Sequence, residues 1–418
     1  MTYLYLHFID LIINASTGLA GGGDDGVLFL PKMSLSMDAN GNVSASRELQ
    51  EAYLFRLPRA FRYADYIWPG LLISPRRIDD IGRFPFRRDD VLIASYPKSG
   101  TTWASEVVSL VLEGGDVDKV KRVPLHDRVP WLELDNSFAW VRVFWLWQMV
   151  AKLFGWKAAE EEEAEESVSG TEGTPRIWFT HLPLELLPKQ AVDGVCKIVY
   201  VSRNPKDTAV SFFHFHRMAR FLGMQASTSW ADFFPLFTAG QIYSGSWFEH
   251  VLSFWRLSRL SDRVLFLKYE DMQKDLSAEV RRIGHFLGVP RLSEERLAAV
   301  SAHCAFKAMR ENRMANRDGV WAINQNVCKF MRKGVVGDWR NYFTVAQSAL
   351  FDAVYEQRMR GTELRFDFGE RVDDEEEKKS APTTPASSPP PRIHIVDVNG
   401  AEADYPGDAA DSRPADAD

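Results

Sequence analysis

A unit of a short apolar strand, a loop and a helix occurs three times along this chain, and it constrains the fold more than any other feature. The strands are expected at Val91–Ser95, Lys197–Ser202 and Arg263–Lys268. Each is followed by a loop and then by apolar residues at helical spacing, as in Trp103–Leu112. This alternation predicts an α/β fold, a single domain with a central parallel sheet flanked by helices. Such sheets bind their ligands at the carboxyl ends of the strands.

The composition fits a folded body rather than a disordered chain. Of the 418 residues 45% are hydrophobic and 26% are charged, which is enough apolar mass to bury one large core or two smaller ones. The formal net charge is -7. Residues 370–418 hold thirteen acidic and five basic residues, so the rest of the chain is close to neutral. A neutral body speaks against a general nucleic-acid binder, because such a protein needs a basic face.

Three segments differ from the body in composition. After a first apolar patch, residues 1–50 are rich in Gly, Asp, Ser and Asn, and we expect a loosely ordered extension there. Within the expected domain, 51–369, the run at about 160–173 carries seven glutamates and no base, which indicates a solvated insertion loop. Residues 370–418 are acidic and Pro-rich, so we expect them to form a disordered tail.

The cysteines and the amino end indicate the compartment. Cys196, Cys304 and Cys328 are too few and too scattered for a disulfide framework, and no Cys or His spacing indicates a zinc site. We therefore expect a cytoplasmic protein without a metal. The apolar run Tyr3–Ile13 resembles the middle of a signal peptide, but it contains Asp10, follows no Lys or Arg and is too short to cross a bilayer. A targeting role for this run stays open, although no membrane attachment is expected.

The sharpest local motif is YPKSGTTW at Tyr96–Trp103, between an expected strand and an expected helix. Backbone amides at a helix start, a glycine that allows close approach, two hydroxyls and a lysine together favour binding of a phosphate group. The motif is not a Walker A loop, because Lys98 precedes Gly100 instead of following the last glycine. Taken alone, the string could equally be an ordinary strand-to-helix turn with a surface lysine.

Three further motifs extend this pattern. They are THLP at Thr180–Pro183, RNPKD at Arg203–Asp207 with Ser211 beyond it, and RKGVVGDW at Arg332–Trp339. Together with YPKSGTTW, and in this order, they resemble the cytosolic sulfotransferase family over roughly Arg59–Phe368. The resemblance implies a transferase with a P-loop-like phosphosulfate-binding loop. Its co-substrate would be 3′-phosphoadenosine 5′-phosphosulfate (PAPS), and it would use no metal.

The resemblance assigns the chemistry to three residues. His181 would be the general base that takes the proton of the acceptor hydroxyl, a role suited to an imidazole with an ordinary pKa of about 6.5. Lys98 would stabilise the bridging oxygen of the leaving phosphate. Ser211, which would also bind the 3′-phosphate, completes the catalytic set. Seen singly, His181 would be an ordinary strand-end histidine, and Ser211 a helix hydroxyl bonded to its own backbone.

The resemblance also implies residues that bind the two substrates. For the donor they are Lys98, Ser99, Gly100, Thr101 and Thr102 at the 5′-phosphate, Arg203, Ser211, Arg332, Lys333 and Gly334 at the 3′-phosphate, and Trp103, Tyr269, Phe306 and Met309 at the adenosine. For the acceptor, Trp131 and Phe215 match aromatic positions that line its site, and two facing aromatic walls would clamp a flat ring. Without the motifs, Trp103 and Trp131 would be interpreted as core residues.

The chain departs from the family pattern at several positions. Phe179 stands where animal members usually have a lysine, so one positive charge near the transferring group is missing. Cys304 and Ala305 replace hydroxyl-bearing residues that commonly contact the nucleotide, which would cost roughly 0.5 to 1.5 kcal/mol for each neutral hydrogen bond not made. The family's dimerisation segment, Arg340–Val345 here, lacks its closing acid at Ala349, so a homodimer stays open with an incomplete motif.

These features favour an active sulfotransferase that moves a sulfuryl group in line to the hydroxyl of a small apolar acceptor, a phenol or a steroid-like alcohol. A catalytically impaired, sulfotransferase-like nucleotide-binding protein is the alternative. The departures from the pattern favour it, whereas the intact Lys98 and His181 speak against it. A nucleoside-phosphate kinase is disfavoured because the Walker lysine is missing. A membrane-bound Golgi enzyme would need the first 15 residues as an anchor.

Overall fold

A computed structural model describes residues 35–37, 43–135, 175–224, 228–320 and 322–369. The expected acidic insertion, the expected tail and the apolar run near the amino end lie outside these residues. The main sheet has four strands in the order β6-β5-β7-β8, and every neighbouring pair is parallel. Its strands are β5 (Val91–Ala94), β6 (Ile177–Thr180), β7 (Lys197–Ser202) and β8 (Val264–Lys268). The expected α/β fold with a central parallel sheet is confirmed.

The register of the strands brings their carboxyl ends to one edge of the sheet. Ala94, the last residue of β5, pairs with Thr180 of β6 and with Tyr200 of β7. Ser202 pairs with Lys268, the last residue of β8. The residues directly after the four strands are Ser95, His181, Arg203 and Tyr269. Because parallel strands end together, sequence motifs more than 150 residues apart converge at this edge.

Alternate residues of each strand belong to two separate cores, one on each face of the sheet. Leu92, Ile198 and Tyr200 belong to the first core, whereas Ile93 and Val199 belong to the second. This is the period of two expected for a strand that is covered on both faces. The short apolar strands of the sequence are therefore buried on both faces, which explains why they show no polar alternation.

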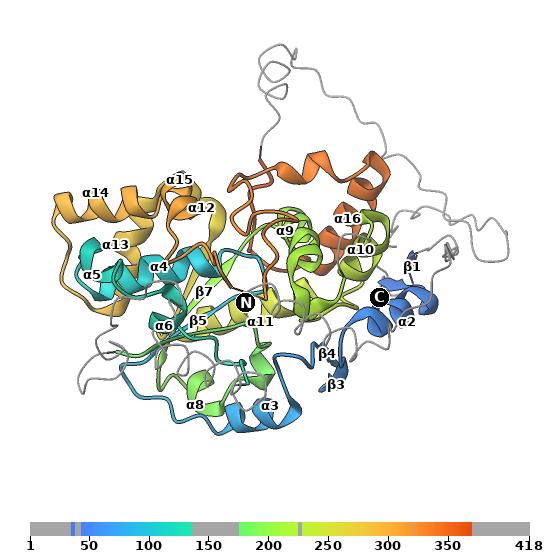
Figure 1. Ribbon diagram of the computed structural model, residues 1–418, viewed down its shortest axis with the longest axis horizontal. Coiled ribbons are helices and arrows are strands. Elements are labelled where there is room, and N and C mark those ends of the chain that lie inside the picture. Colours follow the sequence, from blue (N-terminus) through green and yellow to red (C-terminus); the bar gives the residue numbers. More distant parts are fainter. Residues whose placement is uncertain (1–34, 38–42, 136–174, 225–227, 321, 370–418) are drawn as a thin grey trace, which may run out of the picture. The chain divides into compact units, whose positions relative to one another are not determined.

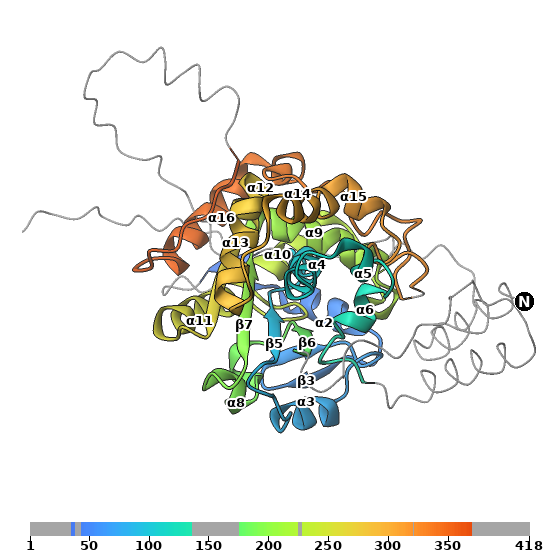
Figure 2. The ribbon, with the colours of Figure 1, turned by 90° about the vertical axis from the view of Figure 1, so that its left-hand side faces the viewer.

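Helices cover both faces of the sheet, as Figures 1 and 2 show. The helices that contribute to the second core are α4 (Thr101–Leu112), α13 (Leu276–Leu287), α14 (Glu294–His303) and α15 (Phe306–Glu311). Those that contribute to the first are α9 (Pro205–Met218), α10 (Trp230–Thr238), α11 (Trp247–Leu260) and α16 (Val345–Arg358). The chain therefore alternates strand and helix on the two sides, as the sequence predicts.

Local sequence fixes where two of these helices begin. Asn204 precedes α9, and its side chain accepts a hydrogen bond from the amide of Asp207 across 2.8 Å while Pro205 occupies the first turn. Asp275 caps α13 in the same way through the amide of Ala278, at 2.9 Å. Such caps satisfy amides that a helix start leaves unpaired. They hold the start of α9 directly behind the end of β7.

Smaller elements complete the described part of the chain. They are β1 (Leu35–Met37), β2 (Val43–Ala45), α2 (Arg47–Arg56), β3 (Phe61–Tyr63), β4 (Tyr66–Trp68), α3 (Pro75–Gly82), α5 (Val117–Val120), α6 (Leu125–Arg128), α8 (Lys189–Val192), α12 (Tyr269–Lys274) and the 3-10 turns Leu184–Leu186, Arg220–Leu222 and Asp338–Asn341. No helix in the described ranges is long and apolar enough to cross a membrane.

The expected boundary of the amino-terminal extension at residue 50 lies too far along the chain. Val43, Ala45 and Leu49 are buried in the first core. The amide of Ala45 donates to Gln241 Oε1 across 2.8 Å, and the Ser46 side chain caps α2. Three apolar side chains in a stretch dominated by polar residues give no lasting period, so the packing of this segment is visible only in the tertiary structure.

Candidate active site

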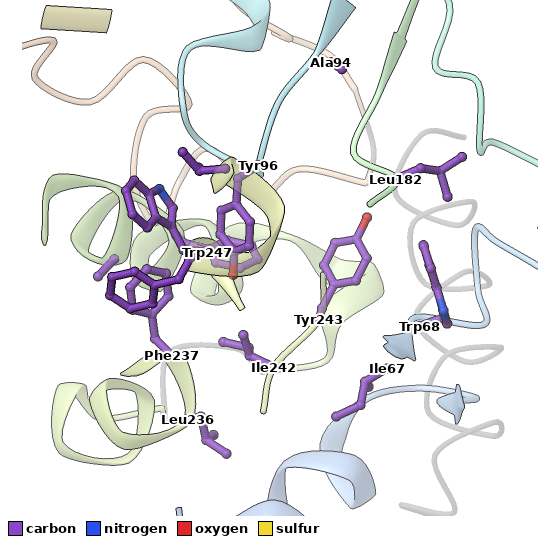
Figure 3. Close-up of a cluster of buried hydrophobic side chains, with 14 of the residues drawn as sticks. Ile67, Trp68, Ala94, Tyr96, Leu182, Leu236, Phe237, Ile242, Tyr243 and Trp247 are labelled. Atoms are coloured by element: carbon purple, nitrogen blue, oxygen red, sulfur yellow. The ribbon is translucent and has the colours of Figure 1, made fainter. Parts of the chain in front are cut away.

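The loop between β5 and α4 is anchored in the first core through Tyr96. This side chain is fully buried, and it lies among Phe237, Tyr243 and Trp247 (Figure 3). Its hydroxyl donates to the carbonyl oxygen of Gly245 across 2.9 Å. Tyr96, the first residue of the YPKSGTTW motif, therefore has a structural role. It holds in place the loop that contains the other residues of the motif.

The loop then turns sharply into α4. Lys98 has a φ of +69° and Gly100 a φ of +110°, both in the left-handed region that favours glycine. A Cβ at Gly100 would lie 2.9 Å from the Tyr269 ring, so the loop approaches α12 too closely for a side chain. The turn leads into the start of α4, where the amides of the first turn lack helical partners. A start of this kind is suited to an anion.

The hydroxyls of the loop differ in what they can offer. Thr101 Oγ1 lies 2.6 Å from Ser95 Oγ, so this hydroxyl is engaged inside the protein. Ser99 is fully buried, and its Oγ has no partner among the described residues. Thr102 is partly exposed and forms no side-chain hydrogen bond within the described ranges. Of the hydroxyls of this loop, Thr102 is thus partly exposed and free of an internal bond, whereas Thr101 would have to break its bond to Ser95 in order to bind a phosphate.

His181 directly follows β6, and its ring is oriented by the end of β5. Its Nδ1 lies 2.9 Å from the carbonyl oxygen of Ser95. A carbonyl oxygen only accepts, so Nδ1 carries the hydrogen and Nε2 keeps its lone pair. No described residue forms a hydrogen bond with Nε2. Because Ser95 Oγ also reaches Thr101 at the start of α4, the imidazole and the phosphate-binding loop are joined through one residue.

A buried acid holds the backbone of His181, and sequence reasoning missed it. Glu133 is fully buried, and its Oε1 accepts a hydrogen bond from the amide of His181 at 2.6 Å. Its Oε2 has no partner among the described residues, and burial raises the pKa of Glu133 to about 7. The only signal in the sequence was an acid two residues after Trp131. A glutamate is rarely fully buried unless a partner pairs with its carboxylate.

Burial shifts the pKa values of both expected catalytic residues. It lowers the pKa of His181 to about 4, with the positive charges of Lys98 and Arg317 acting in the same direction. It lowers the pKa of Lys98 to about 7, and the charges of Arg203, Arg317 and Arg332 add to this. The imidazole is therefore neutral at physiological pH, as a base must be, and Lys98 is close to its titration point in the absence of an anion.

Aromatic rings surround these two residues. Trp131 stacks on Phe179 with ring centroids 6.0 Å apart and planes 6° apart, and both rings stand edge-on to His181. Phe221 connects this pair to Phe215, at centroid distances of 6.5 Å from Trp131 and 5.9 Å from Phe215. Trp131 and Phe215 thus lie on one aromatic surface with Phe221 between them. The sequence did not reveal Phe221, which lies in no motif.

Lys98 lies against this aromatic surface. Its Nζ is 4.7 Å from the centroid of Phe215 and 4.0 Å from that of Phe330, a second ring that sequence reasoning missed. No carboxylate lies within 4.0 Å of Nζ in the described part of the chain. Cation–π contacts of this kind supply only part of the stabilisation that a partly buried ammonium needs. The position of Lys98 therefore favours an anionic partner from outside the chain.

A second group of cations lies at the ends of β7 and β8. The guanidinium of Arg203 is 4.4 Å from the centroid of Tyr269, and the Tyr269 ring is edge-on to Trp103 with centroids 5.2 Å apart. Arg203 Nη2 donates to the carbonyl oxygen of Val335 across 2.8 Å, whereas its buried Nε has no described partner. Three motifs of the sequence meet here, as expected for residues that share one ligand.

Asp207 ties the RNPKD motif to the RKGVVGDW motif. Its carboxylate accepts hydrogen bonds from the amides of Gly337 and Trp339, at 2.8 and 2.9 Å. Within the second motif, Asp338 pairs with the side chains of both Arg332 and Lys333. These two expected phosphate ligands are thus positioned in advance by an acid. An anion that binds them must compete with that acid.

Gly334 and Phe306 form a tight contact between two expected nucleotide residues. A Cβ at Gly334, whose φ is +68°, would lie 2.0 Å from the Phe306 ring. Met309 is 2% exposed and belongs to the second core, so it has no surface to offer a ligand. Cys304 is likewise fully buried, and Ala305 precedes α15 without a side-chain cap. The expected contact of Met309 with the adenosine stays a prediction.

Ser211 lies on α9 one turn from both Asp207 and Phe215. Residues four apart share a face of a helix. Ser211 therefore lies on the same face of α9 as Asp207, which bonds the RKGVVGDW segment, and Phe215, whose ring lies beside Lys98. Its side chain is partly buried and forms no hydrogen bond within the described ranges. Among those same residues, no group of three or more His, Cys, Asp and Glu side chains is arranged to hold a metal ion.

The chain is similar in sequence to known transferases over most of its length. A family model described as the sulfotransferase domain matches residues 88–363. Sulfotransferase 1B1 of Canis lupus familiaris is 39% identical over 301 residues, which make up 72% of this chain and 93% of that protein. Sulfotransferase 1C2 of Homo sapiens is 36% identical over 302 residues, 71% of this chain and 93% of that protein.

Solved structures of the same kind share the fold. Retinol dehydratase in a complex with retinol and PAP has a TM-score of 0.61 and 28% identity, covering 77% of this chain and 96% of its own. The same protein with androsterone and PAP also has a TM-score of 0.61, at 28% identity over 81% and 98%. Mouse sulfotransferase SULT7A1 complexed with PAP has a TM-score of 0.53 and 31% identity, over 72% and 95%.

Proposed function

The chain belongs to the sulfotransferase family, and from this premise we propose that it transfers a sulfuryl group from PAPS to the hydroxyl of a small apolar acceptor, a phenol or a steroid-like alcohol. One observation carries the proposal. Ser95 orients His181 through its carbonyl oxygen, and it bonds Thr101 at the start of α4 through its hydroxyl. A base with a free lone pair is thereby held beside a phosphate-binding loop.

The arrangement of cations fits a donor with two separate phosphates. We assign the 5′-phosphate to the loop of Lys98–Thr102, with its amides and the free hydroxyl of Thr102. We assign the 3′-phosphate to Arg203, Ser211 and the Arg332–Gly334 turn, where a guanidinium fork matches phosphate geometry. Structures of related proteins that contain PAP support this assignment.

The adenosine would lie against the aromatic residues between these two groups. We assign it to Trp103, Tyr269 and Phe306, since Trp103 and Tyr269 already contact each other at the ends of the strands. Met309 would support this site by packing, because it is buried. The Phe306 ring lies so close to Gly334 that no side chain fits at position 334.

Transfer would proceed by displacement at sulfur. The acceptor oxygen forms a new bond to sulfur while the bond from sulfur to the bridging oxygen breaks, and its electron pair remains on the phosphate. Nε2 of His181 takes the acceptor proton, and Lys98 stabilises the charge on the leaving oxygen. The products are a sulfate monoester and 3′,5′-adenosine bisphosphate (PAP). Phosphates of the bound donor would raise the pKa of Lys98 and keep it charged.

The aromatic surface supports an apolar, flat acceptor. Trp131, Phe179 and Phe221 lie next to His181 or to one another, and they present no charge of their own. Retinol and androsterone, which occupy solved complexes of retinol dehydratase, are apolar compounds with a hydroxyl. We therefore propose the same chemical class here, and a screen with radiolabelled PAPS against phenols, catecholamines, hydroxysteroids and retinoids identifies the member.

The central test replaces the base. His181→Ala should abolish turnover of the best acceptor and leave PAP affinity within about twofold, because Nε2 contacts the acceptor proton and not the nucleotide. His285→Ala, an exposed histidine in the last turn of α13, is the matched control and should change neither quantity. Turnover and titration calorimetry with PAP measure the two effects. A loss of PAP affinity as large as the loss of rate would refute the role of His181.

A nucleotide-binding protein with little turnover is the second candidate. It is favoured by Phe179, an apolar ring beside His181, and by a Lys98 that is only partly charged at pH 7 before an anion binds. Tight binding of PAP without transfer to any acceptor of the screen would favour this candidate. A cytoplasmic location and a monomer–dimer equilibrium are further proposals, which fractionation of a tagged protein and light scattering test directly.

A further inference from the structure

Arg317 reaches the site from a segment that no motif marks. Its guanidinium carbon lies 5.8 Å from the centroid of Phe179, and the Phe179 ring lies 5.7 Å from that of His181. The residue follows α15 and has a φ of +61°, a conformation that few residues with side chains adopt. Neighbouring bonds fix this turn, among them the one from Asn316 Nδ2 to the carbonyl oxygen of Arg310 at 2.9 Å.

The guanidinium lacks the acid that Arg203 and Arg332 possess. Arg332 pairs with Asp338, and Arg203 lies 3.7 Å from Asp207. Within the described ranges, no carboxylate lies within 4.0 Å of Arg317, and the same holds for Lys98. Arg317 and Lys98 are thus two unpaired cations that both act on His181, since each lowers its pKa.

An unpaired cation among aromatic rings indicates an anion that the chain itself does not supply. Burial lowers the pKa of Arg317 to about 10, so it is charged at pH 7 in spite of its surroundings. Arg317 is partly buried, and a cation–π contact with Phe179 compensates only part of the cost of shielding this charge from water. The charge of Asp127 raises its pKa, but no ion pair joins the two residues within the described ranges.

We propose that Arg317 binds a non-bridging oxygen of the transferring sulfuryl group and so acts as a second catalytic cation opposite Lys98. The proposal rests on the proposed function and deepens it. During transfer, the acceptor oxygen bonds to sulfur, the bridging S–O bond breaks with its electron pair going to the phosphate, and the acceptor proton goes to His181 Nε2. The sulfuryl oxygens carry negative charge close to that nitrogen. Lys98 binds the bridging oxygen, so Arg317 is the cation that remains for a non-bridging oxygen.

The first experiment replaces the charge. Arg317→Gln should lower kcat for a neutral phenol such as 4-nitrophenol by roughly 10- to 100-fold, the range of one charge-assisted hydrogen bond. Arg317→Lys should recover most of the loss. Arg313→Gln is the matched control, because Arg313 lies near Arg317 in the chain, its side chain is 79% exposed and it is 3.8 Å from Asp318. This control should retain the rate of the parent protein.

A second variant tests whether the position of the charge is what counts. Phe179 and Arg317 are in contact, so Phe179→Lys in the Arg317→Gln background can return a cation to the same place. We expect the kcat of this double variant to be at least tenfold higher than that of Arg317→Gln alone. A merely structural role of Arg317 would not be rescued by a lysine from another element. The acid limb of the kcat/KM profile should also move to higher pH in Arg317→Gln, because a charge that lowers the pKa of His181 is removed.

Binding measurements test the contact without turnover. In the absence of acceptor, Arg317→Gln should weaken PAPS by roughly tenfold and leave PAP, which lacks the sulfuryl group, unchanged. An equal loss for PAPS and PAP would overturn the proposal in favour of a role in nucleotide binding or folding. A loss of rate confined to phenols with a carboxylate would overturn it in favour of acceptor recognition. If the parent protein transfers nothing, the proposed function fails, and the PAPS and PAP comparison still decides the contact.

Discussion

The indole of Trp131 stacks on the ring of Phe179 with planes 6° apart and centroids 6.0 Å apart. Phe179 is the residue whose family counterpart is usually charged, and its ring here forms part of an apolar wall beside His181. The loss of the lysine is therefore also a gain of aromatic surface. Phe179 and Phe221 join the expected pair Trp131 and Phe215 on this aromatic surface.

This stack predicts the acceptor preference. Trp131→Ala should remove one layer of the wall, widen the pocket and shift the ratio of kcat/KM values from 4-nitrophenol toward a 3-hydroxysteroid by roughly three- to tenfold, the scale of one aromatic contact of about 0.5 to 1.5 kcal/mol. Phe55→Ala, at an aromatic residue that is 84% exposed on α2, should leave the ratio unchanged. An unaltered ratio in Trp131→Ala would show that the indole packs only as core.

Lys98 predicts the basic limb of the pH profile. Burial lowers its pKa to about 7, so the ammonium is charged below this pH and loses its charge as the pH rises through it. For the donor, kcat/KM reports the free enzyme and should fall above about pH 7. In the pH profile of kcat, which reports the complex with bound donor, this limb should lie at higher pH because the phosphates of the donor raise the pKa of Lys98. Lys98→Arg should remove the limb near pH 7, because a guanidinium stays charged, and a limb that survives this substitution belongs to another group.

The turn after β7 predicts recognition of the 3′-phosphate. Arg203→Ala and Arg332→Ala should each weaken PAPS by roughly 1.5 to 3 kcal/mol, with Arg332 at the lower end because it must first leave Asp338. Adenosine 5′-phosphosulfate, which lacks the 3′-phosphate, should bind parent and variants almost equally. Titration calorimetry with both donors checks this. Equal losses for the two donors would assign these arginines to the stability of the fold.

A buried ion pair away from the site predicts a stability effect. Glu106 is fully buried and bonds Arg128 at 2.7 Å and His303 at 2.8 Å. Burial alone would raise the pKa of Glu106, but its partners outweigh this and lower it. Its contribution is thus present above the unfolded pKa of about 4.3 and is lost as the pH falls below it. Glu106→Gln should lower the free energy of unfolding by about 3 to 5 kcal/mol at pH 7, because Arg128 stays buried without an acid.

Urea denaturation measures this change, and an exposed pair provides its control. Glu294 lies 2.7 Å from Arg281 on the surface, where both side chains are well exposed. Glu294→Gln should change the free energy of unfolding by less than about 1 kcal/mol, as is usual for exposed pairs. If the two substitutions lower the free energy of unfolding equally, the burial of Glu106 does not strengthen the contribution of its ion pairs to stability.

The amino-terminal segment predicts two different truncation results. Deletion of residues 1–50 removes Val43 and Leu49 from the first core and the Ser46 cap from α2, so it should lower the free energy of unfolding by about 3 to 5 kcal/mol. Deletion of 370–418 should leave specific activity within about twofold, as its composition predicts. Thermal unfolding and turnover compare the two truncated proteins with the full chain. A loss of cooperative unfolding on removal of 370–418 would contradict the second expectation.

The sequence by itself determined the sheet and the centre of the site. Strand and helix periods are local properties, so Val91–Ala94 and Lys197–Ser202 could be recognised from a few neighbouring residues. His181 and Lys98 lie next to such strands within motifs, and parallel strands end at one edge, which brings them together without any knowledge of packing.

Only the tertiary structure decided what surrounds that centre. Glu133, which bonds the amide of His181, and Arg317, which lies against the Phe179 ring beside it, come from segments far from β6 in the chain. No period or spacing encodes such contacts, because they depend on how side chains point once both faces of the sheet are covered. Burial has the same origin, and it is burial that lowers the pKa values of Lys98 and Arg317. The sequence therefore placed His181 and Lys98 at one edge of the sheet, whereas packing set the charges and the aromatic rings around them.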